Sequence, residues 1–221
     1  MTNTCVISDI HGELDLFNPL YMTPGCIQLG DLSDYGYGSW MGCDEPRFFI
    51  DGNHDDHSVL DQTLDSPNEV ASNLFHIPRG MVDGQVLFVG GSESMDKESR
   101  ILNGQPWFAS EGISKKDMER IFSITERVEV VISHDCPGDL LSFLPKDFSG
   151  QPTSSEKWLN LVLSLHRPKL WIFGHHHIQF EAVYQGCRFV CLPSGDKRNF
   201  ELPLSPEGPM SKIQAERTFS S

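Results

Sequence analysis

The sequence lacks a long hydrophobic run. None of the apolar stretches among its 221 residues approaches the roughly 18 residues that a membrane-spanning helix needs. The N-terminal segment also lacks the pattern of a signal peptide, in which a charged region precedes an apolar one. We therefore expect no association with a membrane and a location in the cytoplasm.

Closely spaced cysteine pairs are missing as well. Of the six cysteines, only Cys187 and Cys191 lie within a few residues of each other. Four of the six occur in or beside apolar runs, where a reduced cysteine packs as a small hydrophobic residue. This distribution favours a reducing compartment without disulfide bonds, in agreement with a cytoplasmic protein.

Positive charge is scarce. The chain has 17 Lys and Arg against 31 Asp and Glu, which gives a formal net charge of −14. Binding along a nucleic-acid backbone requires clustered basic side chains, so this balance argues against a general nucleic-acid-binding protein. It does not argue against a small phosphate-containing substrate, because bound cations reverse the local potential around acidic ligands.

Short apolar runs, typical of buried β-strands, recur along the chain. We expect strands near residues 4–9, 26–30, 47–51, 73–77, 81–90, 128–133, 169–173 and 180–192. One helix is predicted from an N-cap at Ser114 to Ile124. A second begins with capping-box spacing at Thr153 and Glu156 and stops before Pro168. This mixture predicts an α/β fold with two mixed sheets flanked by helices.

Composition and length fit one domain. The chain is 38% hydrophobic and contains 14 Phe and four Trp, enough for the core of a single domain, which we place at residues 1–201. After it, Pro203, Pro206 and Pro209 interrupt regular structure, and the end of the chain is polar. We predict that residues 202–221 form a peripheral tail without regular structure or a catalytic role.

Five of the predicted strands run directly into a motif of Asp, Asn or His. In chain order the motifs are Asp9-Ile10-His11, Gly30-Asp31, Gly52-Asn53-His54-Asp55, Ser133-His134 and Gly174-His175-His176-His177. Open α/β sheets build their sites at the carboxyl ends of strands, so we expect these side chains to converge. Mixed oxygen and imidazole ligands suit Mn, Fe, Zn, Co or Ni better than Ca or Mg. The sequence therefore predicts a metal centre.

Strand alternation suggests how two of the motifs present their ligands. In an extended segment, side chains two residues apart share a face, so Asp9 and His11 should face the metal while Ile10 enters the core. The same alternation would place His175 and His177 on one face.

The motifs resemble those of the calcineurin-like metallophosphoesterase superfamily, which are D-x-H, G-D-x-x-D, G-N-H-[DE], H and G-H-x-H. All five blocks are present, in order, over residues 9–177. The resemblance implies a four-layer α/β/β/α sandwich with two mixed β-sheets. Residues 90–97, followed by Arg100, Trp107 and Glu111, are similar to a sequence block in bacterial and phage-encoded members of the superfamily. The chemistry of these side chains does not indicate a function for the block.

The resemblance also implies a role for each motif residue. The implied ligands of two metal ions are Asp9, His11, Asp31, Asn53, His134, His175 and His177. Asp31 would bridge the ions, for which Mn is the leading candidate and Fe, Zn, Ni or Co are alternatives. A metal-bridging hydroxide would attack a phosphate ester in line. His54 would act as the general acid, oriented by a hydrogen bond with Asp34, or would bind a phosphate oxygen.

Two departures from the superfamily pattern narrow the function. Many Ser/Thr protein phosphatases of the superfamily continue the second block as Asp-Arg-Gly, whose Arg binds phosphate, but this chain has Asp34-Tyr35-Gly36. They usually carry Glu where this chain has Asp55. We therefore expect hydrolysis of a small phosphate ester, a phosphodiester or a nucleotide-like phosphate. A phosphoprotein phosphatase and a non-catalytic metal-binding scaffold are the alternatives.

Two further features leave alternatives open. Residues 34–46 have no strand or helix period and form a predicted loop beside the site. Its aromatic residues, which either stack on a nucleobase or pack the loop onto the domain, are Tyr35, Tyr37 and Trp40. Four basic residues are candidates to contact phosphate in place of the missing Arg. They are Arg79, Arg100, Lys197 and Arg198.

Overall fold

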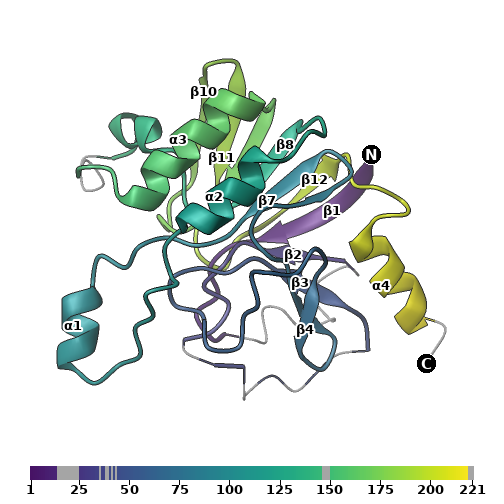
Figure 1. Cartoon of the computed structure of the whole chain (residues 1–221), viewed down its shortest axis with the longest axis horizontal. Coiled ribbons are helices and arrows are strands. Elements are labelled where there is room, and N and C mark those ends of the chain that lie inside the picture. Colours follow the sequence, from purple (N-terminus) through teal and green to yellow (C-terminus); the bar gives the residue numbers. More distant parts are fainter. Residues whose placement is uncertain are drawn as a thin grey trace.

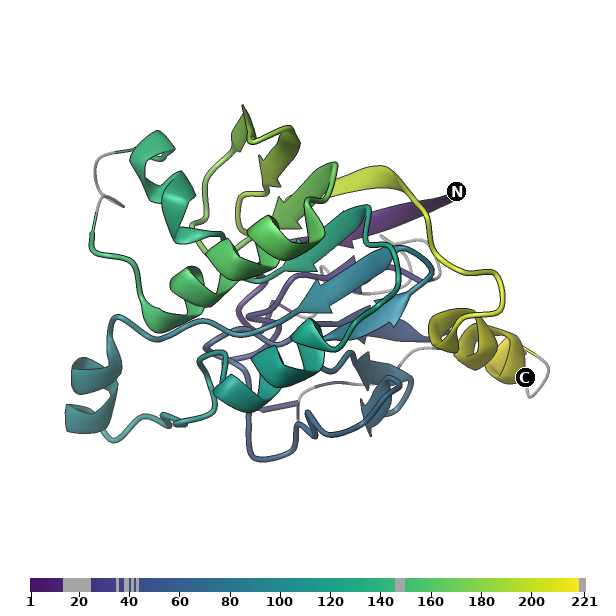
Figure 2. The ribbon, with the colours of Figure 1, turned by 45° about the horizontal axis from the view of Figure 1, so that its top comes forward.

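Two mixed β-sheets form the body of the protein (Figures 1 and 2). The computed structural model describes residues 1–13, 25–34, 36–37, 40, 42, 44–145 and 150–218. The first sheet has the order β12 (Lys197–Leu202), β1 (Thr2–Ile7), β2 (Ile27–Gln28), β3 (Arg47–Phe49), β5 (Leu74–His76) and β4 (Asn68–Ala71). The second has the order β10 (Phe180–Tyr184), β11 (Cys187–Cys191), β9 (Leu170–Phe173), β8 (Val130–Ser133), β7 (Val86–Val89) and β6 (Met81–Asp83).

The two sheets share one pattern of strand directions. In the first sheet β1, β2, β3 and β5 are parallel, and the edge strands β12 and β4 run antiparallel to their neighbours. In the second sheet β11, β9, β8 and β7 are parallel between the antiparallel edges β10 and β6. This confirms the predicted α/β class with two mixed sheets. The strands that precede the five motifs are all central, so their carboxyl ends lie together.

A hydrophobic core fills the space between the sheets. Val6, Ile27 and Phe48 of the first sheet belong to the same buried cluster as Ile132 and Ile172 of the second. The residues of β2, β3 and β8 are buried on both faces, as expected for parallel strands covered on each side. Each large apolar side chain contributes about 1.5–3 kcal/mol when it is fully buried, so this layer fixes the two sheets against each other.

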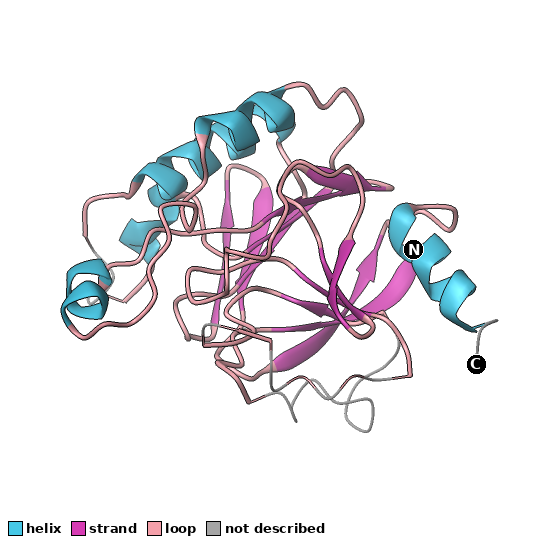
Figure 3. Ribbon diagram, turned by 60° about the horizontal axis from the view of Figure 1, so that its bottom comes forward, coloured by secondary structure: helices cyan, strands magenta, loops and turns pink. Residues whose placement is uncertain are grey.

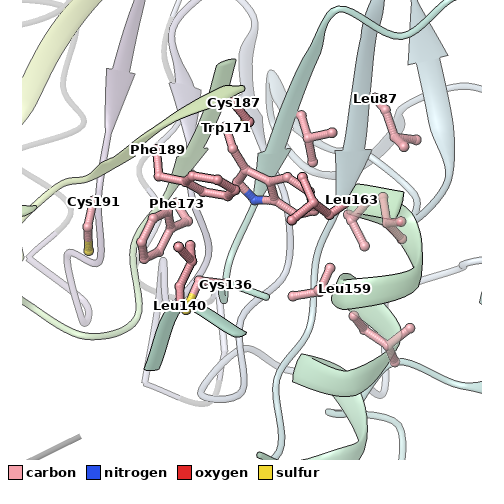
Figure 4. Packing of buried hydrophobic residues seen from close by; sticks show 14 of the residues in the cluster. Leu87, Cys136, Leu140, Leu159, Leu163, Trp171, Phe173, Cys187, Phe189 and Cys191 are labelled. Atoms are coloured by element: carbon pink, nitrogen blue, oxygen red, sulfur yellow. The ribbon is translucent and has the colours of Figure 1, made fainter. Parts of the chain in front are cut away.

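A second core lies between the second sheet and the helices α2 (Lys115–Phe122) and α3 (Ser154–His166). Trp171 and Phe189 stack with ring centroids 5.6 Å apart, and Leu159 and Leu163 of α3 face them (Figure 4). The Trp171 Nε1–H donates to Ser133 Oγ at 2.7 Å, so its one polar group is satisfied in the core. Helices lie at the periphery and strands in the centre of the molecule (Figure 3).

Both predicted helices are confirmed, together with their caps. Ser114 accepts the N–H of Asp117, whose carboxylate accepts the N–H of Ser114 in return. Thr153 and Glu156 make the same reciprocal pair at the start of α3. Each capping box satisfies two backbone donors that a helix start leaves without partners. Two shorter elements, α1 (Lys97–Leu102) and the 3-10 helix η3 (Gly138–Phe143), were not predicted.

The prediction that residues 202–221 lack regular structure is wrong for α4 (Pro209–Thr218). A proline is compatible with the first turn of a helix, where its missing N–H has no intrahelical partner. The Asp83 carboxylate accepts the N–H groups of Ser205 and Met210 at 2.9 and 3.3 Å, which supports this helix start. Met210 is buried against the core between the sheets, so α4 covers apolar surface.

No helix among the described residues combines the length and hydrophobicity needed to span a membrane. Five cysteines within the described ranges are buried with free thiols, namely Cys5, Cys26, Cys136, Cys187 and Cys191. Cys43 lies outside those ranges. The cytoplasmic location remains a prediction.

Candidate metal centre

The five motifs meet at one end of the sheets, as predicted. Asp9, Asp31 and Asn53 follow the carboxyl ends of β1, β2 and β3 in the first sheet. His134 and His175 follow β8 and β9 in the second sheet. Candidate ligand side chains from both sheets therefore lie close together. They form two clusters, and one residue belongs to both.

The first cluster contains the carboxylates of Asp9 and Asp31 and the imidazoles of His11 and His177. One ligand atom from each lies within 4.8 Å of all the others. Nε2 of His11 is 3.1 Å from Nε2 of His177 and 3.7 Å from Oδ2 of Asp31. Oδ1 of Asp9 lies 3.5 Å from Nε2 of His177. Four donor atoms therefore surround one small volume.

The second cluster contains Asp31, His134 and His175, again within 4.8 Å of one another. Nε2 of His134 is 3.1 Å from Nδ1 of His175 and 3.5 Å from Oδ1 of Asp31. The side-chain oxygen of Asn53 approaches the same His134 nitrogen at 3.2 Å. The two oxygens of Asp31 thus face different clusters, Oδ2 the first and Oδ1 the second.

The donor set of the second cluster fits a cation. Nδ1 of His134 lies 2.7 Å from the carbonyl oxygen of Leu29, which only accepts, so Nδ1 carries the proton. In neutral His134 the lone pair of Nε2 then faces the oxygens of Asn53 and Asp31, and this arrangement is repulsive unless a positive charge lies between them. Burial opposes protonation of His134, but Asp31 and Asp9 outweigh it and raise its pKa to about 9. A metal ion would supply the positive charge that this site attracts.

Four of the clustered ligands occupy the left-handed backbone region. The positive φ angles are 43° at His11, 55° at Asp31, 64° at His175 and 53° at His177. Such angles cost non-glycine residues on the order of 1–3 kcal/mol and concentrate at functional sites. The predicted reason for the pairing of Asp9 with His11, alternation along an extended segment, is therefore wrong. Asp9 and His11 still contribute to one cluster, and Ile10 is buried as expected. His175 and His177 contribute to different clusters, so the prediction that they share one face is wrong.

Two motif glycines are required by close approach. A Cβ atom at Gly52 would meet the carboxylate and backbone nitrogen of Asp31 and the ring of His134. A Cβ atom at Gly174 would meet the carboxylate of Asp9 and the hydroxyl of Ser8. In both motifs, the glycine has no side chain and so leaves room for a ligand that follows another strand.

Asp55 connects two of the motif loops. Its buried carboxylate accepts four backbone N–H groups, from Asp31, Leu32, Ser33 and Gly52, at 2.8–3.2 Å. The four donors favour the ionised form, in which both oxygens only accept, whereas burial and the neighbouring Asp31 carboxylate raise the pKa of Asp55 to about 8. The loop that carries Asp31 is thereby fixed to the loop that carries Asn53.

Asp55→Asn should destabilise the fold. The amide would present two N–H donors where backbone N–H groups already converge, so we expect the free energy of unfolding to fall by about 1.5–3 kcal/mol. Urea unfolding of the metal-free protein measures this. Asp65→Asn is the control, because that side chain is 98% exposed and its pairing with Arg120 is a surface contact. Equal stabilities of the two variants would contradict the role of Asp55.

His54 and Asp34 lie beside the first cluster. Oδ1 of Asp34 is 3.1 Å from Nδ1 of His11, a hydrogen-bond distance, and 3.7 Å from Nδ1 of His54. The 3.7 Å separation is beyond hydrogen-bond distance, so Asp34 is within hydrogen-bond distance of His11 and not, between these two atoms, of His54 as predicted. The main-chain N–H of His54 donates to Oδ1 of Asp31 at 2.9 Å, which connects the candidate general acid directly to the shared carboxylate.

Two of the four candidate cations are buried and have structural partners. Arg79 is buried, donates to Asp51 and Asp117, and also donates to the carbonyl oxygen of Gly112. Arg100 is buried against Glu111. Asp51 was not predicted to matter, since nothing local in the sequence distinguishes it from a surface acid, and Glu111 was noted only as part of a block without an assigned role. The remaining candidates, Lys197 and Arg198, lie on β12, where Arg198 pairs with Glu181.

The described aromatic residues of the 34–46 loop pack onto the domain. The ring of Tyr37 is buried, with its centroid 5.4 Å from that of Phe49. Trp40 packs against the same cluster and donates its Nε1–H to the carbonyl oxygen of Ser72 at 2.8 Å. These contacts favour the packing alternative over base stacking for both residues. Tyr35 lies outside the described residues.

Among the comparisons with known proteins, the match to a family profile agrees with this geometry. A comparison with curated proteins gives no significant match. Among solved structures, the chain is similar to a phosphopantetheinyl hydrolase from Mycobacterium tuberculosis, with 16% sequence identity, a TM-score of 0.47, and coverage of 87% of this chain and 90% of that chain. The sequence profile of the family described as calcineurin-like phosphoesterase matches residues 2–179, which include all five motifs. The chain therefore belongs to the calcineurin-like phosphoesterase family.

Proposed function

We propose that this protein is a dinuclear metal phosphoesterase that hydrolyses a small phosphodiester or a nucleotide-like phosphate. Its family membership makes the reaction a metal-dependent hydrolysis of a phosphate ester bond. The observation that carries the dinuclear proposal is the position of Asp31, whose carboxylate belongs to both ligand clusters. Its oxygens lie 3.7 Å from a nitrogen of His11 and 3.5 Å from one of His134, and a carboxylate so placed is suited to bridge two cations.

In this proposal each metal has both oxygen and nitrogen ligands. The first set is Asp9, His11, Asp31 and His177, and the second is Asp31, Asn53, His134 and His175. Mn is the leading candidate, with Fe, Zn, Ni and Co as alternatives, because such mixed sets suit these metals. When bound, two ions would act as Lewis acids toward the phosphoryl group and lower the pKa of an attacking water.

The proton chemistry belongs to side chains beside the ligands. His54 would give a proton to the leaving-group oxygen, and its side chain is 24% exposed, so a substrate can reach it. The N–H of His54 that donates to Asp31 would keep this imidazole next to the reacting phosphate. Asp34 would orient His54 and, through its hydrogen bond, also His11.

Restoration of activity by added metal tests this proposal. The protein is stripped with a chelator and assayed after addition of Mn, Fe, Zn or Ni, with bis-p-nitrophenyl phosphate, p-nitrophenyl phosphate and a phosphopeptide compared side by side. We expect no turnover in the metal-free protein and metal-restored turnover that is fastest on one of the small esters. Faster turnover of the phosphopeptide would instead favour a phosphoprotein phosphatase. Two bound metals with no hydrolysis of any of the three esters would favour a scaffold.

A further inference from the structure

The segment after β7, residues 90–94, contacts the second ligand cluster. Ser92 and Ser94 of this segment contact ligands of the cluster. The chain then extends outward as an arm, residues 95–110, that carries α1 and returns toward α2 (Figures 1 and 2). Arg100 on α1 and Glu111 are each 1% exposed. Nη2 of Arg100 lies 3.0 Å from Oε1 of Glu111. A buried ion pair therefore connects α1 to the returning chain, next to the motif that contains Asn53.

Ser94 connects this ion pair to Asn53. The Ser94 hydroxyl lies 2.5 Å from Oε2 of Glu111, 2.6 Å from Nη1 of Arg100 and 3.2 Å from Nδ2 of Asn53. An ionised carboxylate only accepts and a guanidinium only donates, so Ser94 must give its proton to Glu111 and present its lone pairs to the other two.

The direction of these hydrogen bonds determines the orientation of the Asn53 amide. Because Ser94 presents a lone pair, Asn53 must point its NH₂ group toward Ser94 and its oxygen toward His134, from which that oxygen lies 3.2 Å. Only the oxygen of an amide binds a metal ion. Without the acceptor at Ser94, the amide can turn its NH₂ group toward the cluster, where it cannot act as a ligand.

Ser92 occupies the equivalent position for His175. Its hydroxyl lies 2.6 Å from Oδ2 of the buried Asp135 and 3.4 Å from Nε2 of His175. Oδ1 of Asp135 already accepts the N–H of Cys136 at 2.7 Å. Ser92 therefore donates to Asp135 and presents a lone pair to Nε2–H of His175, so the unprotonated Nδ1 of His175 faces the cluster.

We propose that Ser92 and Ser94 are positioning residues for the second metal, each polarised by a buried carboxylate. Ser94 fixes the amide orientation of Asn53, and Ser92 fixes the tautomer of His175. Both act on ligands of the second cluster and neither touches the first. This inference rests on the proposed dinuclear function, and it gives residues 92–94 a role that the sequence alone did not assign.

Calorimetric titration of the metal-free protein with Mn²⁺ tests the inference on Ser92→Ala, Ser94→Ala and the wild type. We expect two binding steps in the wild type and, in each variant, an affinity about 10–100-fold lower at one step only, the range found when an outer partner of a metal ligand is removed. Ser94→Thr retains the hydroxyl and should restore the affinity. Ser110→Ala, an exposed serine on the same arm, is the matched control and should bind as the wild type does.

The outcomes separate this inference from the proposed function. A wild type that binds only one Mn²⁺ would overturn the dinuclear proposal and this inference with it. Two wild-type steps that stay unchanged in Ser94→Ala and Ser92→Ala would overturn this inference alone, as would equal weakening of both steps. Glu111→Gln provides a second variant, because an amide in place of the carboxylate presents a donor to Ser94. It should weaken the same step as Ser94→Ala.

Discussion

Asp31→Asn is expected to release both metal ions. The substitution removes the negative charge that the two clusters share, and it replaces one carboxylate oxygen with an NH₂ group that faces either His11 or His134. Loss of an outer partner alone lowers metal affinity by about 10–100-fold, so loss of the shared ligand should exceed about 100-fold at each site. Metal content after gel filtration and Mn²⁺ calorimetry measure this, and phosphoesterase turnover should fall with the metals.

Asp9→Asn is the matched control for Asp31→Asn. Asp9 is buried to a similar extent, but it contributes to the first cluster only. This variant should therefore lose one metal and keep the other. If Asp31→Asn retained one tightly bound metal, as Asp9→Asn is expected to do, a bridging role for Asp31 would be refuted.

His54→Ala should lower turnover by about 10²–10⁴-fold, the usual contribution of a general acid, and leave the metal content unchanged. Its imidazole is not among the ligands of either four-residue set, while its main-chain N–H, which Ala retains, donates to Asp31. Turnover measured beside metal content, on wild type and variant, tests both parts of this expectation.

The leaving group distinguishes the two roles considered for His54. A general acid matters most when the departing oxygen is strongly basic, so the loss should be larger for an alkyl ester than for a p-nitrophenyl ester. An imidazole that only binds a phosphate oxygen would lower both activities by the same factor. Equal losses on the two esters would therefore assign His54 to phosphate binding.

The ligand set could be predicted because its residue types stand at strand ends in a fixed order. Each of Asp9, Asp31 and His134 follows a short apolar run whose strand character is apparent from sequence. Their backbone conformation could not be predicted in the same way. Alternation describes extended segments, whereas His11 and His175 have φ angles of 43° and 64°, which depend on contacts with other strands.

The supporting residues were beyond sequence reasoning for a different reason. Arg100 and Glu111 were noted as part of a sequence block, but their pairing across the arm, which gives them a structural role, is not apparent from sequence. The strand β12 was also missed, because its sequence is polar at four of six positions and only Phe200 and Leu202 are buried. Its place in the sheet comes from pairing with β1, a partner far away in the chain.

The composition of the two clusters also makes tight metal binding depend on the folding of the whole chain. Strands β1 to β5 build the first sheet and β6 to β11 the second, so the sheets arise from successive parts of the chain, with β12 joining the first sheet last. Each cluster takes ligands from both sheets, which means that neither half contains a complete set. During synthesis the N-terminal half emerges first, yet it cannot retain a metal tightly until its counterpart has docked. Tight metal binding by a newly made chain would thus begin only after both halves have folded and docked.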